Sequence, residues 1–108
     1  MSYDIWMVAD LGGPEPVAIG DSVNHTYNCS AMFRLALGGN GVNDLEKQTG
    51  RDMLPRLKSG IRHMEENPNL YLPLNPPNGW GSYDTALEYL KELEAMAEAA
   101  PKAMFRVG

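Results

Sequence analysis

Cys29 is the residue with the greatest intrinsic reactivity in the chain, and His25 precedes it by four positions. A cysteine just before a helix has its pKa lowered by the helix dipole, and a neighbouring histidine can accept the thiol proton. The pair could therefore form a thiolate nucleophile. A lone cysteine is more often a small, buried apolar side chain, and we favour that second role for Cys29.

Two segments combine asparagine with aromatic residues in a way that core packing does not explain. They are residues 24–28 (Asn-His-Thr-Tyr-Asn) and 75–84 (Asn-Pro-Pro-Asn-Gly-Trp-Gly-Ser-Tyr-Asp). Asparagine supplies hydrogen-bond donors and acceptors, while Trp and Tyr supply flat apolar faces, and together they can hold a polar small molecule or a peptide. The predicted binding residues are Asn24, Tyr27, Asn28, Asn75, Asn78, Trp80 and Tyr83. In the competing interpretation the asparagines only cap turns and Trp80 closes the end of the core.

The other ligand-binding and catalytic patterns are weak or missing. His25 and His63 are the only histidines, and His63 is expected to face solvent, so we expect neither a metal nor another cofactor. The glycine-rich residues 38–43 lack a preceding strand and a following lysine, which favours a plain turn over a phosphate-binding loop. The glycine-rich dinucleotide and phosphate-loop motifs and the common hydrolase motifs are absent from the sequence.

Length and composition bound the class of protein. The 108 residues, 44% of them hydrophobic, fit a single domain over residues 1–108. A formal net charge of −5 argues against binding to a nucleic-acid backbone, which needs basic residues. The single cysteine excludes an intramolecular disulfide. Without a signal-like N-terminus or an apolar run of about 20 residues, we expect a cytoplasmic protein that does not enter the membrane.

The first half of the chain is expected to form a hairpin and a short helix. Residues 3–10 are β-prone and apolar at successive positions, which predicts a strand buried on both faces. A turn then leads to a weaker strand at residues 16–19. Residues 21–29 are polar and are predicted to be a surface loop. Ser30 is then expected to cap a short helix that ends at Gly38.

The second half of the chain is expected to contain two longer helices and a last strand. The first of these helices has Asp52 as its cap and ends at Asn67, where Pro68 follows. Residues 67–81 are rich in proline and glycine, and they predict an extended connector. The residues expected to pin it to the core are Leu70, Leu72, Leu74 and Trp80. The second helix begins at Ser82 and ends before Pro101, and residues 103–107 form the final strand.

This order of elements predicts an α+β fold. Strands at both ends of a helical middle suggest that the first and last strands pair. We therefore expect a small antiparallel sheet that includes the N- and C-terminal strands. About three helices should cover one face of it.

The same segments carry a resemblance to a known family. The features that carry it are Ser2-Tyr3-Asp4-Ile5-Trp6, the Asn24-x-Thr26-x-Asn28 segment followed by Met32-Phe33, the Asn75-Pro76-Pro77-Asn78-Gly79-Trp80-Gly81-x-Tyr83 stretch, and Pro101-Lys102-Ala103. With these features the chain resembles, over nearly its whole length, a family of small uncharacterised proteins from actinobacteria and their bacteriophages. The resemblance implies an intracellular, stand-alone domain. It implies no catalytic residue.

Three functional hypotheses follow from the sequence. The leading one is a non-enzymatic binding module, such as a bacteriophage accessory protein, that engages a host protein or a small polar ligand through the two asparagine-rich segments. The second is a small enzyme that uses Cys29 or a carboxylate such as Asp84 beside Tyr27. The third is a structural homo-oligomer, such as a homodimer, formed through a sheet edge or through a surface rich in the seven methionines.

Overall fold

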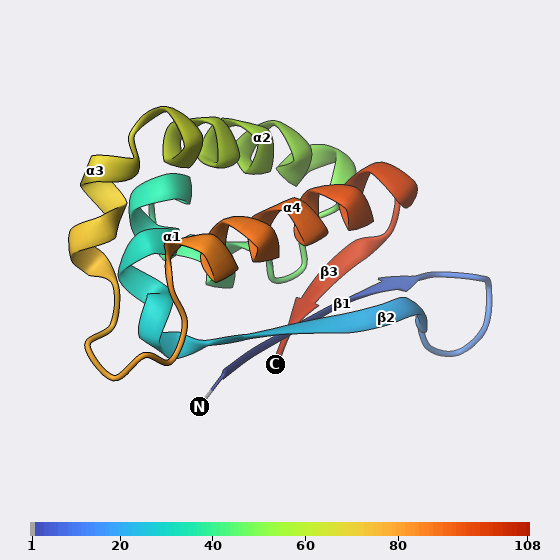
Figure 1. Cartoon of the computed structure of the whole chain (residues 1–108). Helices are drawn as coiled ribbons and strands as arrows, with labels where there is room; N and C mark the ends of the chain where they lie inside the picture. Colours follow the sequence, from blue (N-terminus) through green and yellow to red (C-terminus); the bar gives the residue numbers. More distant parts are fainter. Residues whose placement is uncertain (1) are drawn as a thin grey trace.

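A three-stranded antiparallel sheet forms one layer of the protein, and the helices form the other (Figure 1). The structure is a computed structural model that describes residues 2–108. Strand β1 (Ser2–Ala9) is central, with β2 (Val17–Thr26) on one side and β3 (Met104–Val107) on the other. The predicted α+β fold is confirmed, and so is the pairing of the N- and C-terminal strands.

The sheet is covered on one face only. Along β1, Tyr3, Ile5 and Met7 are buried beneath the helices, whereas Asp4 is exposed and Trp6 is half-buried on the opposite face. The prediction that this strand is buried on both faces was therefore wrong. Trp6 covers part of the open face, since its ring lies against the backbone of Gly108.

Strand β2 continues through the residues that were predicted to form a loop. Its pairing with β1 is interrupted by a bulge, because Met7 lies opposite Ile19 whereas Ile5 lies opposite Val23. Gly20 supports this bulge with a φ of +68°, a conformation that other residues rarely adopt. The polar residues of β2 are compatible with a strand because one face of the sheet is open to water.

Three helices of two turns or more lie on the covered face of the sheet. After a short turn, η1 (Tyr27–Cys29), helix α1 runs over Ser30–Leu37, and η2 (Gly41–Leu45) follows it. The helix lies where it was predicted, but Ser30 is its first residue and not its cap, because the Ser30 hydroxyl donates to the carbonyl oxygen of Tyr27 and Cys29 holds the cap position. Helix α2 (Gly50–Glu66) begins after Thr49 rather than Asp52, because the Thr49 hydroxyl accepts the backbone N–H of Asp52. Helix α4 (Tyr83–Ala99) begins after Ser82, as predicted, where Ser82 and Thr85 form a reciprocal capping box.

The connector between α2 and α4 is more ordered than its composition predicts. It contains one helical turn, α3 (Pro68–Tyr71), and a second short turn, η3 (Leu72–Leu74). Tyr71 is fully buried, and its hydroxyl is hydrogen-bonded to Nδ1 of the half-buried His63, which was predicted to face solvent. Leu70, Leu72 and Trp80 are exposed, so the prediction that they pin the connector was wrong. A helical turn directs Tyr71 inward and its neighbours outward.

The core lies between the sheet and the helices. Its largest fully buried members include Phe33, Leu57, Leu90 and Phe105, from α1, α2, α4 and β3 respectively. Of the helices formed by residues 2–108, none combines the length and the apolar character needed to cross a membrane.

Candidate functional site

The two asparagine-rich segments meet at one end of the molecule, beside the start of α4 (Figure 1). A Cβ atom at Gly81 would lie 2.7 Å from the Thr26 methyl group and 2.8 Å from the Cys29 sulfur, so only glycine fits there. Nε2 of His25 lies 2.9 Å from the Thr85 hydroxyl oxygen. The segments at residues 24–28 and 75–84 are therefore packed directly against each other.

Buried aromatic rings support this junction from within. His25 is nearly buried, and its ring lies within 5.3 Å of the Phe33 ring and 5.2 Å of the Tyr89 ring, measured between centroids. The Tyr89 hydroxyl donates to the backbone carbonyl oxygen of Val23 at 3.3 Å. Burial raises the pKa of Tyr89, so this phenol stays neutral and can donate. These contacts hold the end of β2 against α4.

Three of the four asparagines that were predicted to bind a ligand form side-chain hydrogen bonds within the protein. Nδ2 of Asn24 donates across the sheet to the Ser2 hydroxyl and to the Asp4 carboxylate at 2.9 and 2.8 Å. Oδ1 of Asn75 accepts the backbone N–H of Tyr83 at 2.8 Å. Oδ1 of Asn78 accepts the backbone N–H of Trp80 at 3.0 Å. These three asparagine side chains therefore stabilise strands and turns. This is the role that the competing interpretation of the sequence gives them.

The two tyrosines that were predicted to bind a ligand also make contacts that stabilise the fold. Tyr27 is half-buried with its ring edge-on to Tyr3, the centroids being 4.3 Å apart. The Tyr83 hydroxyl donates to the carbonyl oxygen of Met64 at 2.6 Å and ties the start of α4 to α2. Asn28 is exposed, and its backbone N–H donates to the Thr26 hydroxyl.

Among the predicted residues, Trp80 alone has a large apolar side chain that is exposed. It is 70% exposed, which is unusual for an indole, and so it does not close the end of the core. The loop that carries it, residues 75–82, is nevertheless fixed at both ends: Asn75 binds the backbone of Tyr83, and Gly81 packs against Cys29. We call this segment the Trp80 loop.

A shallow hollow of about 260 Å³ lies beside Asn24, between β2 and α4. Its wall on α4 carries Glu88 and Glu92, and His25 and Thr85 lie at its edge. The sequence did not single out His25 and Thr85 as a pair, because their 60-residue separation hides the contact. The spacing of Ser82 and Thr85, which is that of a capping box, was a usable signal for the start of the helix.

Cys29 is positioned as a packing residue. Its side chain is fully buried, and its thiol lies 3.8 Å from the carbonyl oxygen of Ser82. Burial raises the pKa of the Cys29 thiol, which disfavours the thiolate that a nucleophile requires. This geometry agrees with the role favoured from the sequence, in which Cys29 is a small, buried apolar side chain.

The glycine-rich residues 38–43 form a turn that is filled by the protein's own side chains. The Asp44 carboxylate accepts the backbone N–H of Asn40 at 3.0 Å and pairs with the Arg56 guanidinium at 2.7 Å. A Cβ atom at Gly41 would lie 3.1 Å from the backbone of Phe33. A carboxylate already occupies this turn, so it does not offer its amides to a phosphate.

Residues 2–108 contain no cluster of three or more His, Cys, Asp and Glu side chains placed to hold a metal ion. Comparison with known proteins found no matching family model, no matching curated protein and no matching solved structure.

Proposed function

We propose that this protein is a non-enzymatic module that binds another protein through the Trp80 loop. The observation that carries the proposal is the exposure of Trp80 on a segment whose two ends are fixed. Tryptophan is enriched among the residues that dominate binding energies at protein interfaces. A loop that is already ordered loses little conformational entropy on binding, which favours affinity.

The geometry supports a protein partner better than a small polar ligand. Small molecules bind in concave sites that surround most of their surface. Trp80, Asn75 and Asn78 do not line the hollow beside Asn24. In addition, Asn75 and Asn78 already use their side-chain carbonyl oxygens in turns. An exposed ring on a projecting loop suits insertion into a groove of a partner.

Two further exposed leucines support the same conclusion. Leu70 and Leu72, 52% and 47% exposed, lie on α3 and η3, the turns that lead into the Trp80 loop. Exposed apolar residues that are close together are typical of interaction surfaces. We further propose that the partner is a cytoplasmic host protein, which is the partner class expected from the sequence.

Comparative capture tests the proposal. The wild-type chain and two variants, Trp80→Ala and Leu11→Ala, are immobilised and exposed to an actinobacterial lysate, and bound proteins are quantified by mass spectrometry. Leu11 is the matched control because it is 71% exposed, like Trp80, but lies in the β1–β2 hairpin loop.

The proposal predicts at least one protein that wild type and Leu11→Ala retain and that Trp80→Ala loses by tenfold or more, which corresponds to a loss of binding free energy of about 1.4 kcal/mol or more. Thermal unfolding of Trp80→Ala should be close to that of wild type, because an exposed side chain contributes little to stability. Equal capture by all three chains would contradict the proposal.

A further inference from the structure

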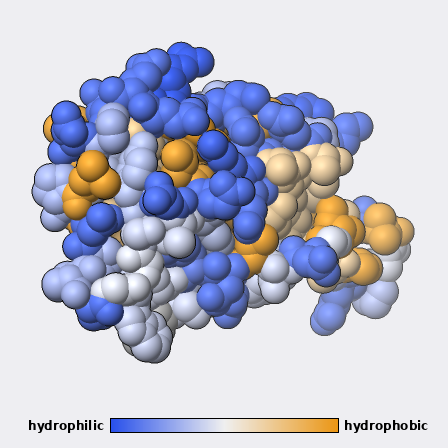
Figure 2. All heavy atoms as spheres, viewed as in Figure 1, coloured by the Kyte–Doolittle hydropathy of each residue, from blue (hydrophilic) through white to orange (hydrophobic). Residues whose placement is uncertain are grey.

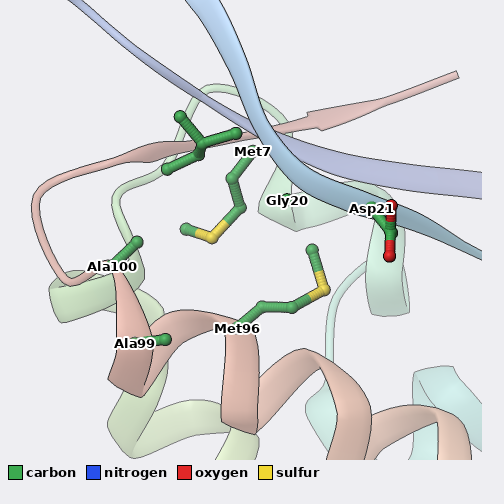
Figure 3. A pocket seen from close by; sticks show the side chains of 7 residues that line it. Met7, Gly20, Asp21, Met96, Ala99 and Ala100 are labelled. Atoms are coloured by element: carbon green, nitrogen blue, oxygen red, sulfur yellow. The ribbon is translucent and has the colours of Figure 1, made fainter.

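A half-open cavity of about 220 Å³ lies at the other end of α4, beneath the β1–β2 hairpin (Figure 3). Met7 and Met96 extend their side chains into it from the sheet and from the helix. Ile19, Ala99 and Ala100 complete an almost entirely apolar wall. Figure 2 shows apolar residues gathered at the surface where the end of α4 meets the hairpin.

The cavity is left open by small residues. Ala99 and Ala100 end α4 where longer side chains would fill the space, and Gly20 forms the part of β2 that faces them. The bulge around Gly20 also bends β2 at this point. An apolar cavity of about 150 Å³ can hold a molecule the size of benzene, so this one can hold an alkyl group of about six carbons.

Among residues 2–108, Asp21 is the only charged residue that lines the cavity. It follows Gly20 in the bulge, and bulges commonly redirect a side chain beside a functional site. None of the ion pairs within residues 2–108 involves Asp21. The cavity therefore has an apolar wall and, at its edge, an exposed carboxylate that forms no ion pair within residues 2–108. This combination is complementary to a cation with an apolar tail.

The arrangement also fixes the direction in which such a ligand enters. Met7 is 2% exposed and forms the floor, whereas Asp21 is exposed and stands at the mouth. An apolar tail must therefore enter first, with its positive charge remaining at the mouth. A lysine side chain of another protein does not fit this order, because its ammonium group is at the leading end.

We propose that this cavity binds a small primary amine with an apolar tail of about four to six carbons. The ammonium group pairs with Asp21, and the tail packs between Met7 and Met96. This inference goes beyond the proposed protein binding, since it uses residues at the opposite end of α4 from the Trp80 loop.

Methionine-methyl NMR on the full chain tests the proposal, with n-hexylammonium as the probe and hexanol and hexanoate as uncharged and anionic analogues. We expect saturable shifts of the Met7 and Met96 methyl signals. Met32 and Met64, buried elsewhere in the core, are the internal controls and should not shift. Hexylammonium should bind about two- to fivefold more tightly than hexanol, as expected for a solvent-exposed ion pair, and hexanoate should bind least tightly.

Three variants separate the contribution of the Asp21 charge to ligand binding from that of the apolar cavity. Asp21→Asn should remove the preference for hexylammonium over hexanol, whereas Asp84→Asn, at an exposed acidic residue at the opposite end of α4, should retain it. Ala99→Leu should fill the cavity and weaken binding of both probes at least tenfold. Absence of saturable shifts at Met7 and Met96 would overturn the binding site. Equal affinity for hexylammonium, hexanol and hexanoate would overturn the assignment to an amine.

Discussion

Nε2 of His25 lies 2.9 Å from the hydroxyl oxygen of Thr85, and this contact joins two residues that are 60 positions apart. It fixes the end of β2 to the first turn of α4. Because Thr85 also accepts the backbone N–H of Ser82, one hydroxyl serves both the helix cap and the junction between the two asparagine-rich segments. The position of the Trp80 loop, which ends at Ser82, depends on this junction.

Replacing Thr85 with Val should destabilise the protein by about 1–3 kcal/mol. The variant removes the hydroxyl that contacts Nε2 of His25 and that accepts the backbone N–H of Ser82, and the loss of such hydrogen bonds carries a cost of that size. Thr85→Ser retains the hydroxyl and serves as the control. Urea unfolding followed by circular dichroism measures both. Equal unfolding free energies for the two variants would show that the contact contributes nothing.

The Cys29 thiol should resist modification in the folded protein. It is fully buried with a raised pKa, so a thiol-specific reagent should react slowly in buffer and rapidly in urea. Cys29→Ser should lower the unfolding free energy by about 1–3 kcal/mol, because it buries a hydroxyl in place of a thiol. Rapid modification of the native protein would instead indicate a reactive cysteine and would revive the enzyme hypothesis.

Acid should weaken the fold partly through Asp44. The Arg56 hydrogen bond holds the pKa of the Asp44 carboxyl below its ordinary value. A carboxyl whose pKa is lower in the folded state than in the unfolded state stabilises the fold at pH values above its unfolded-state pKa, which is about 3.9 for Asp. This contribution is lost as the pH falls from that value through the folded-state pKa. Asp44→Asn should therefore be less stable than wild type at pH 7, and the difference should shrink between pH 4 and pH 2. A difference that is constant over this range would contradict the account.

Local signals in the sequence were sufficient to predict much of the fold. The cap at Ser82 and the proline after Asn67 located the start of one helix and the end of another, because each depends on only a few adjacent residues. The pairing of the terminal strands followed from the order of the elements. Thr49 was missed as the cap of α2 because Asp52, three residues later, is an equally suitable residue type.

Features that depend on tertiary contacts were not predictable in the same way. Residues 21–26 have the composition of a loop, and they form a strand because β1 supplies hydrogen-bond partners and the open face tolerates polar side chains. In the connector, Leu70 and Tyr71 are adjacent apolar residues, and only the helical turn of α3 decides that Tyr71 is buried and Leu70 exposed. The same limit applies to the site, since the sequence could not show that Gly81 packs against Cys29.

The burial of Trp80 in a complex tests the proposed function most directly. In a Trp6→Phe variant labelled with 7-azatryptophan, position 80 alone carries the analogue, and its red-shifted fluorescence is distinguishable from that of the partner's tryptophans. Acrylamide should quench the free protein strongly, because Trp80 is 70% exposed. Saturating amounts of the captured partner should reduce the quenching constant severalfold. A partner that binds this variant with wild-type affinity and leaves Trp80 as accessible as before would contradict the central claim.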